Sequence, residues 1–575
     1  MRPLAVFAAA LAAIPTAYPQ APAQNPAADP VLQAMRDEIE RSRQLTVSNL
    51  ASPYFIQYLI DQEDSFTVSA SLGGLVTRRR TQFRAPQVQV RVGDYSFDNT
   101  NFGGGFGGSR YDLGAFPTEN AYPEMRRYLW LQTDMAYKSA VEALSRKRAA
   151  ARGITQNEQI NDFAHAEPVR YQAPLHGLLI DEDAWANRVR ALSALFTGFP
   201  DVVYSTVDLD AGAGGYYIAN SEGTEVRAAE NVVDLRARAM AQAADGMSVA
   251  DAVVFHAFDA ARLPADAELR QGITDLAHNV VALAHAPKGE DYAGPVLFEG
   301  MAGPQIFAEL LGRNLSIVRR PLGGGGGRGG AAQTSELEGR IGAKVLPDSF
   351  DVVDDPLQKE WRGRPLFGSY DVDREGVIPK PLHLVEKGVL KGFLLTRQPV
   401  RGFEGSNGRA RLPGPGGAMA AIGNLFVSSS DTVPAADLKK KLIELIQARN
   451  RPYGILVRKM DFPSAATGGT GLTGFAPAGG ARPISAPILV YRIYPDGREE
   501  LVRGLRFRNA DVRSLRDILA AGDDSQVFEF LNQGTGFTAE TCVVAPSILI
   551  DDLELYPAEQ ESPKPPIVPA PEMTR

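Results

Sequence analysis

Apolar and polar residues follow two different patterns along the chain, and the pattern changes near residue 290. Before that point, segments with apolar residues three and four positions apart lie between segments in which apolar and polar residues alternate. After it, short apolar runs are separated by glycine and proline, which is typical of strand-rich structure. The pattern predicts an α+β fold: an N-terminal domain of long helices on an antiparallel sheet, followed by a strand-rich C-terminal domain.

Helical and strand-like spacing predicts the individual elements. The first helix begins after Asp29, a good N-cap, with Pro30 at its first position. Val88, Val90 and Val92 alternate with polar residues, as in a half-buried antiparallel strand. The predicted helices are 30–45, 124–152, 183–196, 264–286 and 435–448. The predicted strands of the N-terminal half are 53–61, 65–72, 87–97, 201–209 and 216–227.

The stretch Tyr292 to Leu315 has the pattern of a strand, a turn and a helix. The apolar run Pro295 to Glu299 passes through Gly300 and Gly303 into an amphipathic segment. Its apolar side carries Ile306, Leu310 and Leu311. Because glycine accepts tight turns and close backbone approach, we expect the chain to turn sharply here.

The N-terminus has the pattern of a secretory signal peptide. Arg2 supplies a positive charge, residues 4–14 are apolar, and small residues offer cleavage after Ala17 or Ala23. The alternative is a membrane anchor, but the apolar run is shorter than the roughly 20 residues that a spanning helix needs. We therefore expect a periplasmic or secreted protein with no stable membrane anchor.

The predicted organisation of the chain has five parts. A tail rich in proline and glutamate ends the sequence and is expected to be disordered. The parts are a signal peptide (1–23), a linker (24–30), an N-terminal and middle α+β region (31–289), a strand-rich C-terminal domain (290–557) and the tail (558–575).

Charge and cysteine content argue against a nucleic-acid-binding protein and against a disulfide-stabilised one. A net charge of −8 is opposite to the basic excess of a dedicated nucleic-acid binder, so no nucleic-acid partner is expected. The single cysteine, Cys542, excludes an internal disulfide. It lies in an apolar strand-like run, where a buried thiol that packs as a small apolar group is expected.

Five sequence blocks, in order, resemble those of the TldD/PmbA family of metallopeptidase-related proteins. The most distinctive is REGVIPKPLHLVEKGVLKGFLLT, a predicted hairpin that turns at Lys387-Gly388. The resemblance extends over roughly residues 200–556. The blocks are 218–226, 335–356, 374–396, 422–431 and 545–555.

The resemblance also shows where this chain departs from the catalytic members of that family. Their HExxxH helix, which binds a metal, corresponds here to Glu299, Gly300, Met301, Ala302, Gly303 and Pro304. Both ligand histidines and the glutamate between them are absent. The family's third ligand, a cysteine before the closing strand, has no counterpart in residues 531–540. We therefore predict no catalytic residue, no metal ligand and no cofactor in this chain, and expect a divalent metal (zinc) in a partner.

No other nucleophile scheme is indicated by the sequence. Ser369 and Ser406 lie in predicted loops with no histidine near them in sequence, and no G-x-S-x-G motif is present. His383 alternates with Leu382 and Leu384, so it is expected to point away from the apolar face of its strand.

Three functional hypotheses follow from the resemblance. The first is a non-catalytic, TldE/PmbA-like subunit that shapes a groove for extended peptides and pairs with a metal-binding TldD-like paralogue in proteolysis. Glu299 and Asn424 are its candidate groove residues. The second is a stand-alone peptide-binding or scaffold protein of the cell envelope. The third is an active metallopeptidase with a divergent site.

Overall fold

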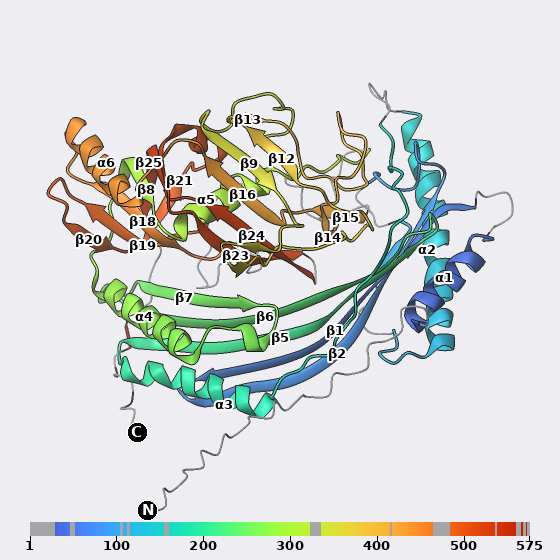
Figure 1. Ribbon diagram of the computed structural model, residues 1–575, viewed down its shortest axis with the longest axis horizontal. Coiled ribbons are helices and arrows are strands. Elements are labelled where there is room, and N and C mark those ends of the chain that lie inside the picture. The colour runs from blue at the N-terminus through green and yellow to red at the C-terminus, as the bar shows by residue number, and fades with distance from the viewer. Residues whose placement is uncertain are drawn as a thin grey trace, which may run out of the picture.

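A computed structural model describes nine ranges of the chain and four single residues near its end. The ranges are 29–45, 52–103, 107–111, 116–153, 160–322, 335–414, 417–463, 484–534 and 537–558. The predicted signal peptide and nearly all of the predicted tail lie outside them. The fold is mixed α+β with a strand-rich C-terminal part, which lies over one face of a long curved sheet (Figure 1).

The curved sheet has seven strands in the order β3-β2-β1-β5-β6-β4, with β7 also paired to β6. Two long antiparallel hairpins, β1–β2 and β5–β6, form most of it. The short β4 is parallel to β6. The strands are β1 (Pro53–Ser71), β2 (Gly74–Val92), β3 (Ser109–Tyr111), β4 (Arg170–Gln172), β5 (Val202–Asn220), β6 (Glu225–Gln242) and β7 (Ser248–Ala257).

The predicted strands 53–61 and 65–72 are in fact one continuous strand, β1. The polar residues Gln62, Glu63 and Asp64 between them pair with β2 on one side and with β5 on the other. They were not predicted as strand because none of them is apolar. In the fold they continue the alternation of the strand, with Glu63 on the face toward the C-terminal part.

Helices cover the outer face of the curved sheet, with α1 and α2 at one end and α3 and α4 at the other (Figure 1). The Asp29 carboxylate accepts hydrogen bonds from the amides of Val31 and Leu32, so the predicted cap is confirmed. The helices are α1 (Pro30–Ser42), α2 (Tyr122–Ala151), α3 (Glu182–Ser193), α4 (Asp266–His285), α5 (Ala302–Leu310) and α6 (Ala435–Ala448). Short 3-10 turns lie at Ala194–Gly198, Ala260–Arg262, Gly312–Asn314 and Val512–Asp517.

The C-terminal part contains two large sheets with α5 between them. One has the order β13-β12-β9-β16-β24-β23, and the other β17-β22-β25-β8-β18-β19-β20, with β21 on β25. The strands of the first are β9 (Phe350–Asp354), β12 (Leu382–Glu386), β13 (Val389–Leu390), β16 (Asn424–Ser429), β23 (Gln526–Gly534) and β24 (Phe537–Ala545). Those of the second are β8 (Tyr292–Phe298), β17 (Thr432–Val433), β18 (Gly454–Met460), β19 (Pro487–Ile493), β20 (Glu499–Val502), β21 (Leu505–Arg508), β22 (Ile518–Gly522) and β25 (Ile548–Pro557). Two small hairpins, β10 (Glu360–Trp361) with β11 (Arg364–Pro365) and β14 (Ala410–Gly414) with β15 (Gly417–Ala420), complete it.

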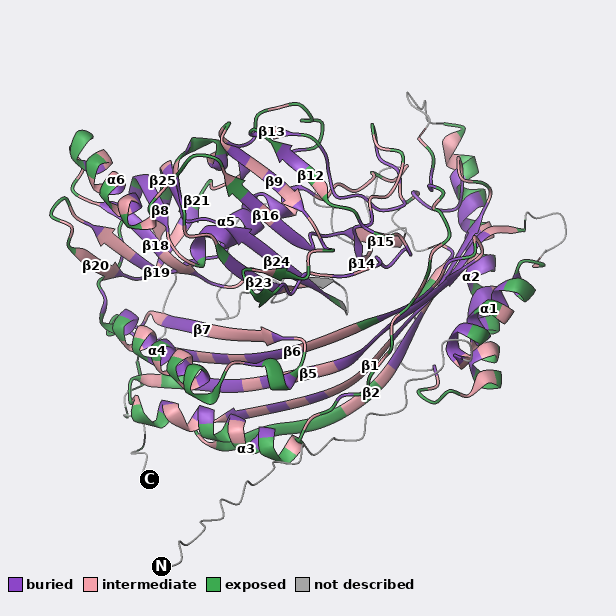
Figure 2. Cartoon of the chain, viewed as in Figure 1, coloured by how far each residue is buried: buried purple, intermediate pink, exposed green. Residues whose placement is uncertain are grey.

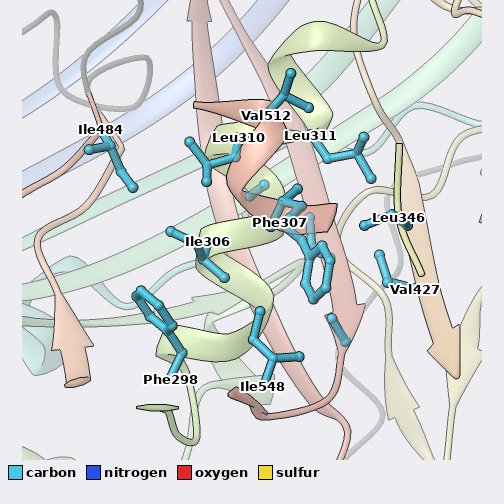
Figure 3. Close-up of a cluster of buried hydrophobic side chains, with 14 of the residues drawn as sticks. Phe298, Ile306, Phe307, Leu310, Leu311, Leu346, Val427, Ile484, Val512 and Ile548 are labelled. Atoms are coloured by element: carbon cyan, nitrogen blue, oxygen red, sulfur yellow. The ribbon is translucent and has the colours of Figure 1, made fainter. Parts of the chain in front are cut away.

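Helix α5 is enclosed on all sides, as Figure 2 shows by colour. Figure 3 shows Ile306, Phe307 and Leu310 of α5 among side chains from both sheets, including Val427 of β16 and Ile548 of β25. The predicted strand-turn-helix at this stretch is therefore confirmed, but the helix is buried all round. Because α5 packs at the centre of the C-terminal core, the backbone at the N-terminus of α5 is held in place.

Buried polar contacts join the C-terminal part to the curved sheet. The Tyr216 hydroxyl on β5 donates to the Val372 carbonyl. Arg374 lies between the carboxylates of Asp61 on β1 and Glu230 on β6, with its guanidinium over the Tyr216 ring. These contacts hold the two parts in one arrangement. Among the described residues, no helix is long and apolar enough to cross a membrane.

Candidate functional site

The first position of the degenerate motif, Glu299, is held in an ion pair. It follows β8, and its amide donates to the Val457 carbonyl at 3.0 Å. Its carboxylate accepts from the Arg458 guanidinium at 2.8 Å, and Arg458 also pairs with Glu499 at 3.0 Å. The Glu299 and Arg458 side chains are 37% and 38% exposed. The one carboxylate at the six motif positions is therefore paired with a cation of the same chain.

The glycines of the motif pack the N-terminus of α5 against the start of β25. Gly300 has φ +60°, a conformation that favours glycine, and its amide donates to the Ser547 hydroxyl at 3.1 Å. A Cβ at Gly303 would lie 2.5 Å from the Pro546 carbonyl oxygen. Any side chain at position 303 would therefore force the backbone between β24 and β25 to move.

The donor set at these positions does not fit a divalent metal. Gly300 and Pro304 have no side-chain donor, and Glu299 is already paired. Across the described ranges, no group of three or more His, Cys, Asp and Glu is arranged to hold a metal ion. Cys542 is fully buried in β24, and its side chain lies with Val544 in a cluster separate from that of α5. Burial raises the pKa of its thiol well above the usual value.

Asn424, the second candidate groove residue, is fully buried at the start of β16. Its side-chain amide donates to the Gln358 carbonyl at 2.9 Å, and a Cβ at Gly368 would lie 2.7 Å from its Oδ1 atom. The side chain thus fixes the turn after β9. His383 is largely exposed on its strand, 4.0 Å from Glu386.

A hollow of about 580 Å³ lies between the curved sheet and the C-terminal part. Its floor is the inner face of β1, β5 and β6, and Leu531, Thr538 and Glu540 of β23 and β24 face it from the other side. A second cavity of about 330 Å³ shares Thr67, Asp210 and Arg236 with it, so the hollow continues along the sheet. Neither Glu299 nor Asn424 lines it. The predicted groove residues and the hollow are therefore in different places.

Carboxylates dominate the lining of this hollow, and several of them have perturbed pKa values. Burial raises the pKa of Asp234 to about 8, and the nearby Asp208 adds to the shift. Burial and the charge of Glu230 raise the pKa of Glu540 to about 7. Burial also raises the pKa of Asp61, against the opposing effect of Arg374. Perturbed carboxyl groups in a concave site are typical of functional sites.

A larger cavity, about 710 Å³, lies elsewhere, between the end of α2 and residues 317–322 and 335–341. Two of its cations, Lys147 and Arg319, both pair with the buried Asp162. Both cations are therefore engaged with a carboxylate of the same chain, whereas the acidic hollow contains a buried carboxylate oxygen without a hydrogen-bond partner.

Comparison with known proteins identifies the C-terminal part. Residues 292–556 match the model of the PmbA/TldA metallopeptidase C-terminal domain. A metalloprotease of Archaeoglobus fulgidus is 33% identical over 93 residues, which cover 16% of this chain and 20% of that protein. The match thus spans about a fifth of the length of that curated relative.

Solved structures resemble the fold over most of the chain. A protein described as a candidate modulator of DNA gyrase from Thermotoga maritima has a TM-score of 0.58 at 15% identity, covering 91% of this chain and 99% of that one. TldE from Thermococcus kodakarensis has a TM-score of 0.56 at 13% identity, with the same coverage. At these identities the likeness concerns the fold alone.

Proposed function

This chain belongs to the TldD/PmbA family, and from that premise we propose that it is an exported, non-catalytic subunit of the TldE/PmbA kind. It would shape a groove for extended peptides and work in proteolysis with a metal-binding TldD-like paralogue. One observation carries this proposal: the carboxylate of Glu299 is committed to Arg458, and the positions of the base and the second histidine are Gly300 and Pro304.

The chemistry of the motif explains why these replacements matter. Two imidazoles one helical turn apart hold the metal, and the glutamate takes a proton from the water that the metal activates. A glycine and a proline can do neither. The divalent metal, which we propose to be zinc, would therefore reside in the partner, and this chain would bind and orient the peptide.

The hollow over the curved sheet is the proposed place for the peptide. It lies on a sheet face and not along a sheet edge, so side chains would supply most of the contacts. The composition of residues 1–23 supports export to the periplasm or beyond. We propose the division at residues 290–557 as the C-terminal domain, close to the matched range of 292–556.

Co-expression with a paralogue that carries HExxxH tests the assignment. We expect a stable complex that cleaves an unstructured peptide, while neither chain alone does so at a comparable rate. The matched control replaces both motif histidines of the paralogue, which should abolish cleavage and leave the complex intact. Failure to associate at micromolar concentrations would contradict the proposal.

A stand-alone peptide-binding protein of the envelope is the second candidate. Both sides of the hollow, the curved sheet and strands β23 and β24, come from this one chain, so no partner is needed to form it; this favours the second candidate. Peptide binding by the isolated protein, with no association with any HExxxH paralogue from the same cell, would favour it over the first. Cleavage by the isolated chain that a chelator stops would instead favour an active metallopeptidase with a divergent site.

A further inference from the structure

The inner face of the curved sheet carries a row of polar side chains. Odd-numbered residues of β1 and even-numbered residues of β5 and β6 face the C-terminal part, while their neighbours pack under α3 and α4. Strand register places Thr67, Asp210, Asp234 and His256 side by side across four strands. Two carboxylates, Asp210 and Asp234, are thus direct cross-strand neighbours, an arrangement that is unfavourable without a compensating cation.

Most charges of the hollow are balanced inside the chain. Arg374 pairs with Asp61 and Glu230, and Arg236 pairs with Asp210. Glu540 pairs with Arg411 at 2.8 Å. The acidic lining therefore divides into paired carboxylates and a remainder.

Asp234 and Glu63 are the two carboxylates of the lining whose charge or hydrogen bonding is not fully compensated within the chain. Asp234 is only 4% exposed, lines the hollow, and its Oδ1 atom is buried with no hydrogen-bond partner. Its other oxygen is 3.5 Å from the Arg236 Nε atom, but Arg236 is engaged with Asp210. Glu63 has no cationic partner among the described residues. A buried carboxylate oxygen without a donor is costly, and a ligand that supplies the donor removes that cost.

Gly212 on β5 makes room for the Glu63 carboxylate. A Cβ at Gly212 would lie 2.7 Å from the Glu63 Oε1 atom, so the Glu63 carboxylate lies directly over this glycine. Glu63 and Asp234 both line the hollow of about 580 Å³, which a long side chain from outside could enter.

We propose that this hollow is a subsite for a cationic side chain, the ammonium of lysine or the guanidinium of arginine on an extended peptide, bound between Glu63 and Asp234. The inference rests on the proposed function and adds a substrate class to it. An N–H donor would satisfy the Asp234 Oδ1 atom, and its positive charge would favour the ionised form of Asp234 and offset the charge of Glu63. An anionic or apolar side chain would leave the Asp234 Oδ1 atom without a donor and Glu63 without a cation.

Fluorescence anisotropy of labelled peptides on the full chain, alone and with its paralogue, tests this inference. The peptides are identical extended sequences of serine and alanine with lysine, norleucine or glutamate at the centre. We expect the lysine peptide to bind about tenfold more tightly than the norleucine peptide, which matches it in length but has no charge. The preference should shrink as salt is raised.

Substitutions in the hollow assign the preference to the two carboxylates. Glu63→Gln with Asp234→Asn should remove it, and Glu63→Lys should make the glutamate peptide the better ligand. The matched control, Glu268→Gln with Asp275→Asn, removes two exposed carboxylates from α4 on the opposite face of the same sheet and should change nothing. Glu63→Gln alone, at a half-buried position, serves if the double variant does not fold, and should reduce the preference about threefold.

Two results would overturn the inference, and they can be told apart. Equal binding of lysine and norleucine peptides refutes the cationic subsite and leaves the peptide groove standing. No binding of any peptide, by the chain or by its complex, refutes the groove and the subsite together.

Discussion

The Arg374→Met substitution should weaken the junction between the C-terminal part and the curved sheet and so destabilise the protein. Arg374 is 7% exposed and lies between the carboxylates of Asp61 and Glu230, and its guanidinium carbon is 4.8 Å from the centre of the Tyr216 ring. Methionine keeps the apolar length of the side chain but removes the charge. Two carboxylates at the junction would then have no cation.

The expected loss is large because the partners stay behind. Removing one member of a buried ion pair costs about 3–5 kcal/mol, since the other charge is left uncompensated. The cation–π contact with Tyr216 adds on the order of 1 kcal/mol. We therefore expect the free energy of unfolding in urea to fall by about 4–6 kcal/mol at pH 8.

The pH dependence of the free energy of unfolding tests whether uncompensated carboxylates cause the loss of stability. Without Arg374, the pKa of the buried Asp61, already raised by burial, rises further above its unfolded value. The folded state then holds protons that the unfolded state releases, so the variant loses stability as pH rises above the normal carboxyl range. We expect the deficit to be smaller at pH 5 than at pH 8.

Two further variants control the interpretation. Asp61→Asn combined with Arg374→Met should recover part of the stability, because one uncompensated charge is gone. Arg36→Met removes an exposed arginine, 3.5 Å from Glu225, and should change stability by less than about 0.5 kcal/mol. A deficit equal at both pH values, or no deficit at all, would refute the role given to Arg374.

Three other outcomes are expected. Gly303→Ala should destabilise the protein by about 1–3 kcal/mol in thermal unfolding, because its methyl group would meet the Pro546 carbonyl; a neutral effect would contradict the packing described here. Asp234→Asn should stabilise the protein more at pH 8 than at pH 5. The pKa of Asp234 is about 8 in the folded protein, so folding of the unsubstituted chain loses up to about 1.4 kcal/mol per pH unit between the unfolded pKa and about 8, and asparagine removes that loss. Equal effects of the substitution at both pH values, measured by urea unfolding, would argue against that pKa. Restoring the motif should not create a stoichiometric zinc site, because the third ligand is still missing; metal analysis of the purified variant checks this, and one zinc per chain would contradict it. The restored variant carries Glu299→His, Gly300→Glu and Pro304→His.

Local pattern predicted the elements whose own residues determine them. Helix α6 has the predicted bounds, since Leu438, Leu442 and Ile446 form one apolar stripe that packs on the sheet beneath it. The hairpin at Lys387-Gly388 has positive φ at both residues, 48° and 74°, as a two-residue turn of this kind requires.

The hollow could not be predicted in the same way. Its lining comes from four strands of one sheet and from residues more than 130 positions later, so it exists only after register and docking are set. The sequence does carry one signal: Asp234, Arg236 and Arg238 alternate with small apolar residues on β6. Such a strand buries one face and keeps charges on the other, but the pattern alone does not say that a second sheet will cover those charges.

Metal content and cleavage, measured on the chain alone and on its reconstituted complex, test the central claim most directly. We expect the isolated chain to hold no stoichiometric transition metal and to leave an unstructured peptide intact, while the complex holds zinc in the paralogue and cleaves the peptide. A stoichiometric metal in the isolated chain, together with cleavage that a chelator stops, would contradict the claim that this subunit assists and does not cut.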